Sequence, residues 1–190
     1  MSMIRRMLVC VVAWALLGFA PAFAVTERPA ATPERDGSHD FDFDFGTWQT
    51  HITRRLHPLT ESTQFIELTG TVVVRRIFEG RGALEEIEAD GPKGHWEGMS
   101  VFLYDPAAHE WSQTFISAAR GTFSNGLIGS FKDGRGELFA QDTLDGRFIL
   151  IRGAWSNISA DAHRYEESYS DDGGKTWELV FTANLTRKKS

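Results

Sequence analysis

The sequence predicts an all-β protein, an antiparallel up-and-down β-barrel of about ten strands. From Phe41 onward, apolar residues do not recur at helical spacing over any window of about a dozen residues, so no helix is expected there. β-branched and aromatic residues instead alternate with polar ones, as they do in half-buried strands. Glycine and Asp-Gly pairs separate these runs, and such short turns favour a meander that curls back on itself.

The chain begins with what reads as an export signal. Arg5 and Arg6 precede the apolar run Met7–Phe19, and Ala22 to Ala24 fit the small-x-small rule for cleavage. We therefore expect residues 1–24 to be a signal peptide and the protein to be periplasmic or secreted. An uncleaved N-terminal anchor is the alternative, although the apolar run is short for a membrane span.

Charge and cysteine content limit the partners. Cys10 lies in the leader, so the mature chain would contain no disulfide and would depend on its core for stability. Removing Arg5 and Arg6 leaves 18 basic residues against 26 acidic ones, a net charge of −8. This sign argues against nucleic acid and against an anionic membrane surface as partners, and no membrane span is expected after cleavage.

The remaining chain divides into a spacer and one domain. Residues 25–40 are rich in Pro, Ala, Thr and charge, so we expect a flexible linker there and a barrel over residues 41–187. The predicted strands are Thr47–Leu56, Gln64–Phe78, Ala83–Ala89, Trp96–Tyr104, Trp111–Ser117, Thr122–Phe131, Glu137–Asp142, Arg147–Trp155, His163–Tyr169 and Trp177–Thr186.

The turns between these strands have residues suited to them. Glycines in Glu79–Gly82 tolerate positive φ, and Pro106 suits the second position of a turn. Asp133-Gly134 and Asp145-Gly146 are strong hairpin signals.

The start of the first strand, Gly46-Thr47-Trp48, resembles the calycin superfamily of lipocalins, fatty-acid-binding proteins and haem-binding nitrobindins. The resemblance implies that Trp48 closes one end of the barrel beneath a basic side chain, for which Arg187 and Arg54 are the candidates. The other interpretation is that Trp48 is an ordinary core residue. Under either interpretation its role is structural.

Four motifs together resemble an uncharacterised bacterial family, domain of unknown function 1579. They are the Phe-Gly-Thr-Trp start at residues 45–48, the turn Phe78–Glu86, the hairpin Tyr104-Asp105-Pro106 with Trp111, and the hairpin Ser170–Trp177. The resemblance covers Phe43 to Thr186, with one glycine more than the family pattern in Arg81-Gly82-Ala83-Leu84. It implies the barrel, but it implies no activity and no catalytic residue.

Ser170–Trp177 also matches the Asp-box pattern of sialidase-like propellers. One copy does not make a propeller, which needs repeated blades. We therefore predict a structural hairpin in which the Asp172 carboxylate caps turn amides.

The interior of the barrel is the candidate site. With Trp48 facing inward, we expect a small apolar ligand to contact Trp48, Phe102, Tyr104, Gln113 and Phe115. A barrel filled by its own side chains is the alternative. On the strand Ala83–Ala89, alternation sends Glu86 and Glu88 to one face, which a solvated surface explains, and Glu85 with Ile87 to the other.

No catalytic residue and no metal site is predicted, because the six histidines show no ligand spacing. Nitrobindin-like barrels carry a haem-ligating histidine late in the chain, which makes His163 a candidate axial ligand; a surface histidine at a turn is the other interpretation. An enzyme with a polar site at the barrel mouth, using Tyr104 or His163 for acid–base chemistry, also stays open.

Overall fold

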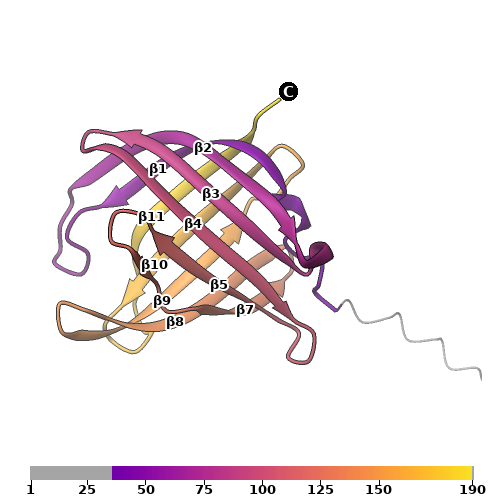
Figure 1. The fold of residues 1–190 in the computed structure, drawn as a ribbon. Coiled ribbons are helices and arrows are strands. Elements are labelled where there is room, and N and C mark those ends of the chain that lie inside the picture. Colours follow the sequence, from indigo (N-terminus) through magenta and orange to yellow (C-terminus); the bar gives the residue numbers. More distant parts are fainter. Residues whose placement is uncertain (1–35, 190) are drawn as a thin grey trace, which may run out of the picture. The chain divides into compact units, whose positions relative to one another are not determined.

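The computed structural model describes residues 36–189, and these form an all-β barrel (Figure 1). Ten antiparallel strands close the barrel in sequence order, with β4 paired to β5 and β1 paired to β11. The predicted fold class is therefore confirmed. The strands are β1 (Gly46–Arg55), β2 (Phe65–Ile77), β3 (Gly82–Gly91), β4 (Gly94–Asp105), β5 (Glu110–Ser117), β7 (Leu127–Lys132), β8 (Arg135–Leu144), β9 (Arg147–Ser156), β10 (Ala162–Ser170) and β11 (Glu178–Arg187), with the two-residue β6 (Thr122–Phe123) beside β5.

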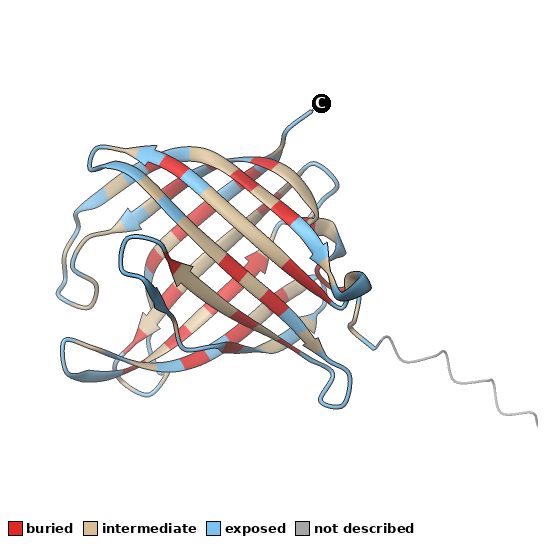
Figure 2. Ribbon diagram, in the orientation of Figure 1, coloured by how far each residue is buried: buried red, intermediate tan, exposed pale blue. Residues whose placement is uncertain are grey.

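Alternation along each strand separates the interior from the surface. In β1, Trp48, Thr50 and Ile52 are buried while the residues between them are more exposed, and the same alternation recurs around the barrel (Figure 2). Because side chains in a strand point to opposite faces in turn, the inward face is fixed once Trp48 is placed inside.

The predicted Asp-Gly hairpins form as expected. Asp133-Gly134 and Asp145-Gly146 both have positive φ at the two central positions, with 52° and 77° in the first and 51° and 79° in the second. This geometry matches the twist of the flanking strands and is why Asp-Gly is favoured there.

The predicted strand Thr122–Phe131 is wrong as a single element. It is divided into β6 and β7, and the Asn125 amide in the break donates to the Gln141 carbonyl at 2.9 Å. After Ser117 the chain turns back and β6 pairs with the end of β5, so β7 pairs with β5 only from Leu127 to Gly129.

The domain begins earlier than residue 41. Gly37 accepts a hydrogen bond from Trp111 Nε1 at 2.9 Å, and Asp40 is buried. Residues 36–40, expected in the linker, therefore contact the barrel. The rest of the expected linker and the expected signal peptide lie outside the described residues.

A short segment before β1 closes one end of the barrel. The 3₁₀ turn η1 (Asp42–Asp44) follows Phe41, whose ring is 1% exposed. That ring packs against Phe102, Trp111, Phe131 and Trp155 with centroid distances of 4.8, 5.0, 4.9 and 5.0 Å. Edge-to-face packing of this kind adds to the free energy of burying the rings. We call this end the closed end and the opposite end the mouth.

Trp48 lies at the closed end, with its Nε1 donating to the Asp44 carbonyl at 2.7 Å. Of the two candidate covering residues, the structure selects Arg187, whose Cζ is 4.0 Å from the Trp48 ring centroid. Arg54 lies near the other end of β1, inside the barrel. No helix in the described residues has both the length and the apolar character to cross a membrane.

Candidate functional site

The barrel encloses a cavity of about 560 Å³ between the closed end and the mouth. Its apolar wall comes from inward residues of almost every strand, among them Ile52, Ile87, Trp96, Phe102, Phe115, Ile149, Trp155 and Phe181. The volume lies in the range of ordinary small-molecule sites. The alternative of an interior filled by its own side chains is therefore wrong.

The cavity opens toward the loops that join β1 to β2, β5 to β7 and β8 to β9. His57, Arg120, Asn125 and Leu144 in or beside these loops contribute to its lining. Each of these loops lies at the end of β1, β5 or β8 that is farthest from the closed end. A ligand would therefore enter from the mouth.

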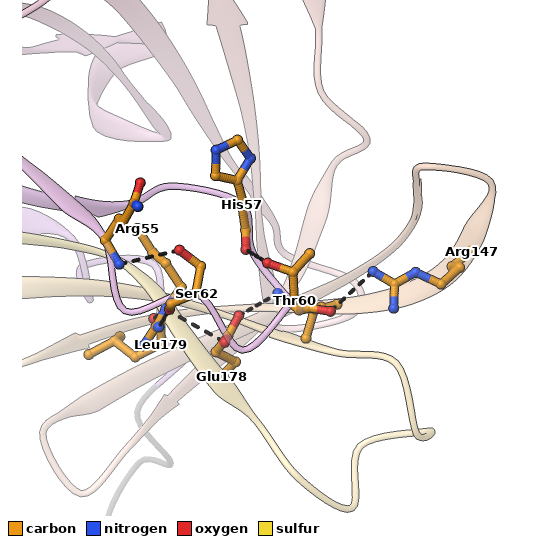
Figure 3. Close-up of polar contacts among 9 residues, drawn as sticks. Arg55, His57, Thr60, Ser62, Arg147, Glu178 and Leu179 are labelled. Carbon is orange, nitrogen blue, oxygen red and sulfur yellow. Dashed lines mark hydrogen bonds and ion pairs between the residues drawn. The ribbon is translucent and has the colours of Figure 1, made fainter.

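The β1–β2 loop at the mouth has an unusual backbone. His57, Leu59 and Glu61 have φ of 56°, 59° and 61°, a region that residues other than glycine adopt rarely. Contacts with neighbouring strands hold it (Figure 3), since Leu59 N donates to Glu178 Oε2 at 2.6 Å and Arg147 Nη2 donates to the Leu59 carbonyl at 3.3 Å. The loop is thus stabilised from β9 and β11.

Glu85 is the most unusual polar side chain in the cavity. It occupies an inward position of β3, and the exposure that it retains is to the cavity. Burial, followed by the nearby Asp44 carboxylate, raises the pKa of Glu85 to about 8, while the Ser100 hydroxyl acts in the opposite direction. At neutral pH this carboxyl is largely protonated.

A second polar group lies on β10. Tyr165 Oη donates to Glu167 Oε2 at 3.2 Å, and Tyr169 also hydrogen-bonds this carboxylate. Burial raises the pKa of Glu167, and the two tyrosines and Arg54 act against the rise. Burial, then Glu167, raises the pKa of both Tyr165 and Tyr169.

Three buried polar atoms of cavity-lining residues have no hydrogen-bond partner, namely Thr50 Oγ1, Gln113 Oε1 and His163 Nδ1. An unpartnered buried polar atom is costly, and such atoms mark places where a ligand or water completes the bonding. They lie on β1, β5 and β10, on three sides of the cavity wall.

His163 is enclosed, and the surface interpretation of this residue is wrong. It is 4% exposed, with its ring 4.5 Å from Trp48 and 5.1 Å from Phe43 by centroids. Its Nε2 lies 3.2 Å from Asp44 Oδ1, although the atoms are not aligned as a hydrogen bond. The Nε2 atom is turned to Asp44, while Nδ1 is the unpartnered atom of this ring. The role of His163 as a haem ligand stays a prediction.

The structure brings together only some of the predicted ligand contacts. Phe102, Gln113 and Phe115 line the cavity, whereas Trp48 and Tyr104 lie at the closed end and are not part of its wall. Tyr104 packs against Trp111 and donates to the Asp36 carbonyl. A polar site at the mouth using Tyr104 or His163 is therefore not assembled.

Several cavity residues were missed by the sequence argument, above all Glu85 and Glu167. Alternation sends Glu85 to the face opposite Glu86 and Glu88, so the signal was present. It was not used because inward carboxyls are uncommon. Within residues 36–189, no group of three or more His, Cys, Asp or Glu side chains is arranged to hold a metal ion.

Comparison with known proteins identifies the fold alone. No protein-family model matches the chain, and a search of curated proteins found no similar sequence. Among solved structures, the S-type phycobiliprotein lyase CPES from Guillardia theta is similar at 12% identity, covering 79% of this chain and 91% of its own, with a TM-score of 0.53. EF1p2_mFAP2b bound to DFHBI is similar at 12% identity, covering 80% of this chain and 99% of its own, with a TM-score of 0.44. A de novo designed fluorescence-activating β-barrel is similar at 14% identity, covering 81% of this chain and 99% of its own, with a TM-score of 0.42.

Proposed function

We propose that this protein binds a small, largely apolar molecule inside its barrel and does not transform it. The observation that carries the proposal is the cavity of about 560 Å³, plugged by aromatic rings at one end and reached from the loops at the other. Burial of a ligand against Phe102, Phe115, Trp155 and Phe181 supplies the affinity, since apolar area removed from water is the main favourable term.

We further propose that the protein acts outside the cytoplasm and belongs to the family of domain of unknown function 1579. The leader-like residues 1–24 and the order of the four turn motifs support these two statements. Neither bears on which molecule is bound.

A variant that fills the cavity tests the binding proposal. Ala183 is a buried, inward residue of β11 that lines the cavity, and Asn184 beside it is exposed on the outer surface. We expect Ala183→Phe to abolish binding of a neutral apolar fluorescent dye such as N-phenyl-1-naphthylamine, while Asn184→Phe leaves it unchanged. Equal dye binding by both variants, with both folded by circular dichroism, would show that the cavity is not the site.

A further inference from the structure

Glu85 places a carboxyl group in the cavity wall, which favours a ligand that carries a positive charge. We infer that the ligand is an amphipathic organic cation, an apolar amine whose ammonium group lies against Glu85 while its apolar part fills the cavity. This inference rests on the proposed function and names the class of molecule bound.

The position of Glu85 excludes an ordinary surface role. On the outer face of β3, the neighbouring Glu86 pairs with Arg75 at 2.6 Å. Glu85 points the other way, between the inward positions of Val74 on β2 and Ser100 on β4. It is thus a carboxyl held inside a largely apolar space, a placement that costs free energy in the ligand-free protein.

Ser100 hydrogen-bonds Glu85 and connects it to Gln113 on β5. Gln113 Nε2 donates to Ser100 Oγ at 3.1 Å, which leaves Gln113 Oε1 as a buried acceptor without a partner. An ammonium group has three donors and no acceptor. It would bond to the Glu85 carboxylate, once this has ionised, and to the free Gln113 amide oxygen, whereas a ligand with acceptors alone would leave the Gln113 oxygen unsatisfied.

Aromatic rings in the wall suit the same ligand. Trp96 and Phe115 stack with centroids 5.9 Å apart, and Trp155 and Tyr165 lie 4.8 Å apart. All four line the cavity. Aromatic faces attract cations through their quadrupole, most strongly where water is excluded.

Opposite charge elsewhere does not neutralise Glu85. Arg54, inside the barrel on β1, acts on Glu167 and Tyr169. Asp44 of η1 raises the pKa of Glu85 and also faces His163 of β10. Glu85 in turn raises the pKa of Tyr165 on β10. Val74 of β2 and Ser100 of β4 are the strand neighbours of Glu85. A carboxylate ligand would therefore find no cationic partner among the groups that act on Glu85, since Arg54, Arg55 and Arg120 line the cavity near its mouth.

Binding of a cation would be linked to protons. Because the pKa of Glu85 is about 8 in the free protein, the carboxyl is mostly protonated at pH 6.5 and must ionise to pair with an ammonium group. Binding of an amine at pH 6.5 would then release about one proton, and binding at pH 9.5 would release almost none. A neutral ligand needs no such ionisation.

Isothermal titration calorimetry with three probes of one shape tests the inference. Tryptamine, tryptophol and indole-3-acetate differ in carrying an ammonium, a hydroxyl and a carboxylate. We expect tryptamine to bind about tenfold or more tighter than tryptophol at pH 8.5, since bonds to charged groups are the stronger ones. Titrations at pH 6.5 in buffers of different ionisation enthalpy would give the proton release.

The matched variants are Glu85→Gln inside the barrel and Glu86→Gln on its outer face. We expect Glu85→Gln to remove both the tryptamine preference and the proton release, and Glu86→Gln to keep both. Binding of tryptophol as tight as that of tryptamine, or a preference unaffected by Glu85→Gln, would overturn the inference and leave the proposed function standing. If none of the three probes binds, and Ala183→Phe binds the dye as well as Asn184→Phe does, the proposed function itself is overturned.

Discussion

The guanidinium of Arg187, near the end of β11, lies over the ring of Trp48, near the start of β1, with 4.0 Å between Cζ and the ring centroid. Arg187 Nη1 also donates to the Phe45 carbonyl at 2.9 Å and Nη2 to the Phe43 carbonyl at 3.0 Å. One side chain thus covers the ring and ties down the segment that plugs the barrel. The closed end is a structural device, as the Gly-x-Trp resemblance implied.

Trp48→Ala should be strongly destabilising. Trp48 is 0% exposed, so truncation leaves a large cavity and removes the surface on which Arg187 rests. We expect the free energy of unfolding to fall by about 3–5 kcal/mol, as for other large-to-small core changes. Urea denaturation measures it, with exposed His51 on the same strand as the control position. A loss under about 1 kcal/mol would mean that Trp48 is not a core residue.

Glu85 should make the stability fall as the pH rises. Its pKa is about 8 in the folded protein against an ordinary value of 4.5, so the folded state binds the proton more tightly. Its contribution is most favourable below pH 4.5, is lost progressively up to pH 8, and stays lost above it.

Glu85→Gln removes this loss. Relative to the unmodified protein, we expect the variant to gain on the order of 3 kcal/mol between pH 4.5 and pH 8.5, measured by urea unfolding across that range. Glu86→Gln, on the exposed face, should show no such gain. A difference between Glu85→Gln and the unmodified protein that does not change with pH would contradict the buried position of this carboxyl.

Asp172 should contribute stability that falls as the pH is lowered, the opposite of the dependence expected for Glu85. It accepts hydrogen bonds from Thr176 N, Thr176 Oγ1, Ser170 Oγ and Lys175 N, and these hold the pKa of the carboxyl well below its ordinary value of 3.8. The hairpin predicted from the Asp-box pattern is therefore confirmed. The stabilisation is complete above pH 3.8 and is lost as the pH falls below it.

We expect Asp172→Ala to lower the melting temperature at pH 7. The difference in melting temperature between this variant and the unmodified protein should narrow as the pH falls from 4 toward 2. Differential scanning calorimetry at several pH values measures this gap. Asp171→Ala, which breaks only the surface pair with Arg147, is the control. A gap that stays constant down to pH 2 would show that the capping carboxylate is not responsible.

Glu178 should restrict the mobility of the β1–β2 loop at the mouth of the cavity. Its Oε2 accepts from Leu59 N at 2.6 Å and fixes a loop whose backbone includes three non-glycine residues of positive φ. Glu178→Ala removes the bond to Leu59 and the pair of Glu178 Oε1 with Arg55 Nε at 3.7 Å. We expect it to speed amide exchange at residues 57–62 by about tenfold or more and to speed release of a bound dye. Glu137→Ala, which breaks a pair with Arg135 at the far end, should change neither rate.

Sequence alone predicted the fold closely because alternation and turn residues act locally. Asp133-Gly134 and Asp145-Gly146 mark their hairpins through a backbone requirement of the turn itself. The break between β6 and β7 was missed although Asn125-Gly126 is a dipeptide typical of turns. In the structure, Ser124 bonds to Phe115 on β5 while Asn125 bonds to Gln141 on β8, which separates β6 from β7.

The site was harder to predict, for a geometric reason. Alternation says which residues face inward, and it placed Trp48, Phe102 and Gln113 inside correctly. It does not give their height along the barrel axis, which depends on strand tilt and stagger. Trp48 and Tyr104 therefore share the inner face with Phe115 but lie at the plug, while Glu85 and Glu167 lie in the cavity wall.

The pairing of Trp48 with Arg187 joins positions at the two ends of the described chain. During synthesis β1 can pair with β2 at once, but its other edge has no partner until β11 has left the ribosome. Until then this edge of β1 is open to other chains, and contacts of such long sequence separation form slowly. β11, the last strand of the described residues, therefore covers the edge of β1 at which another chain could pair.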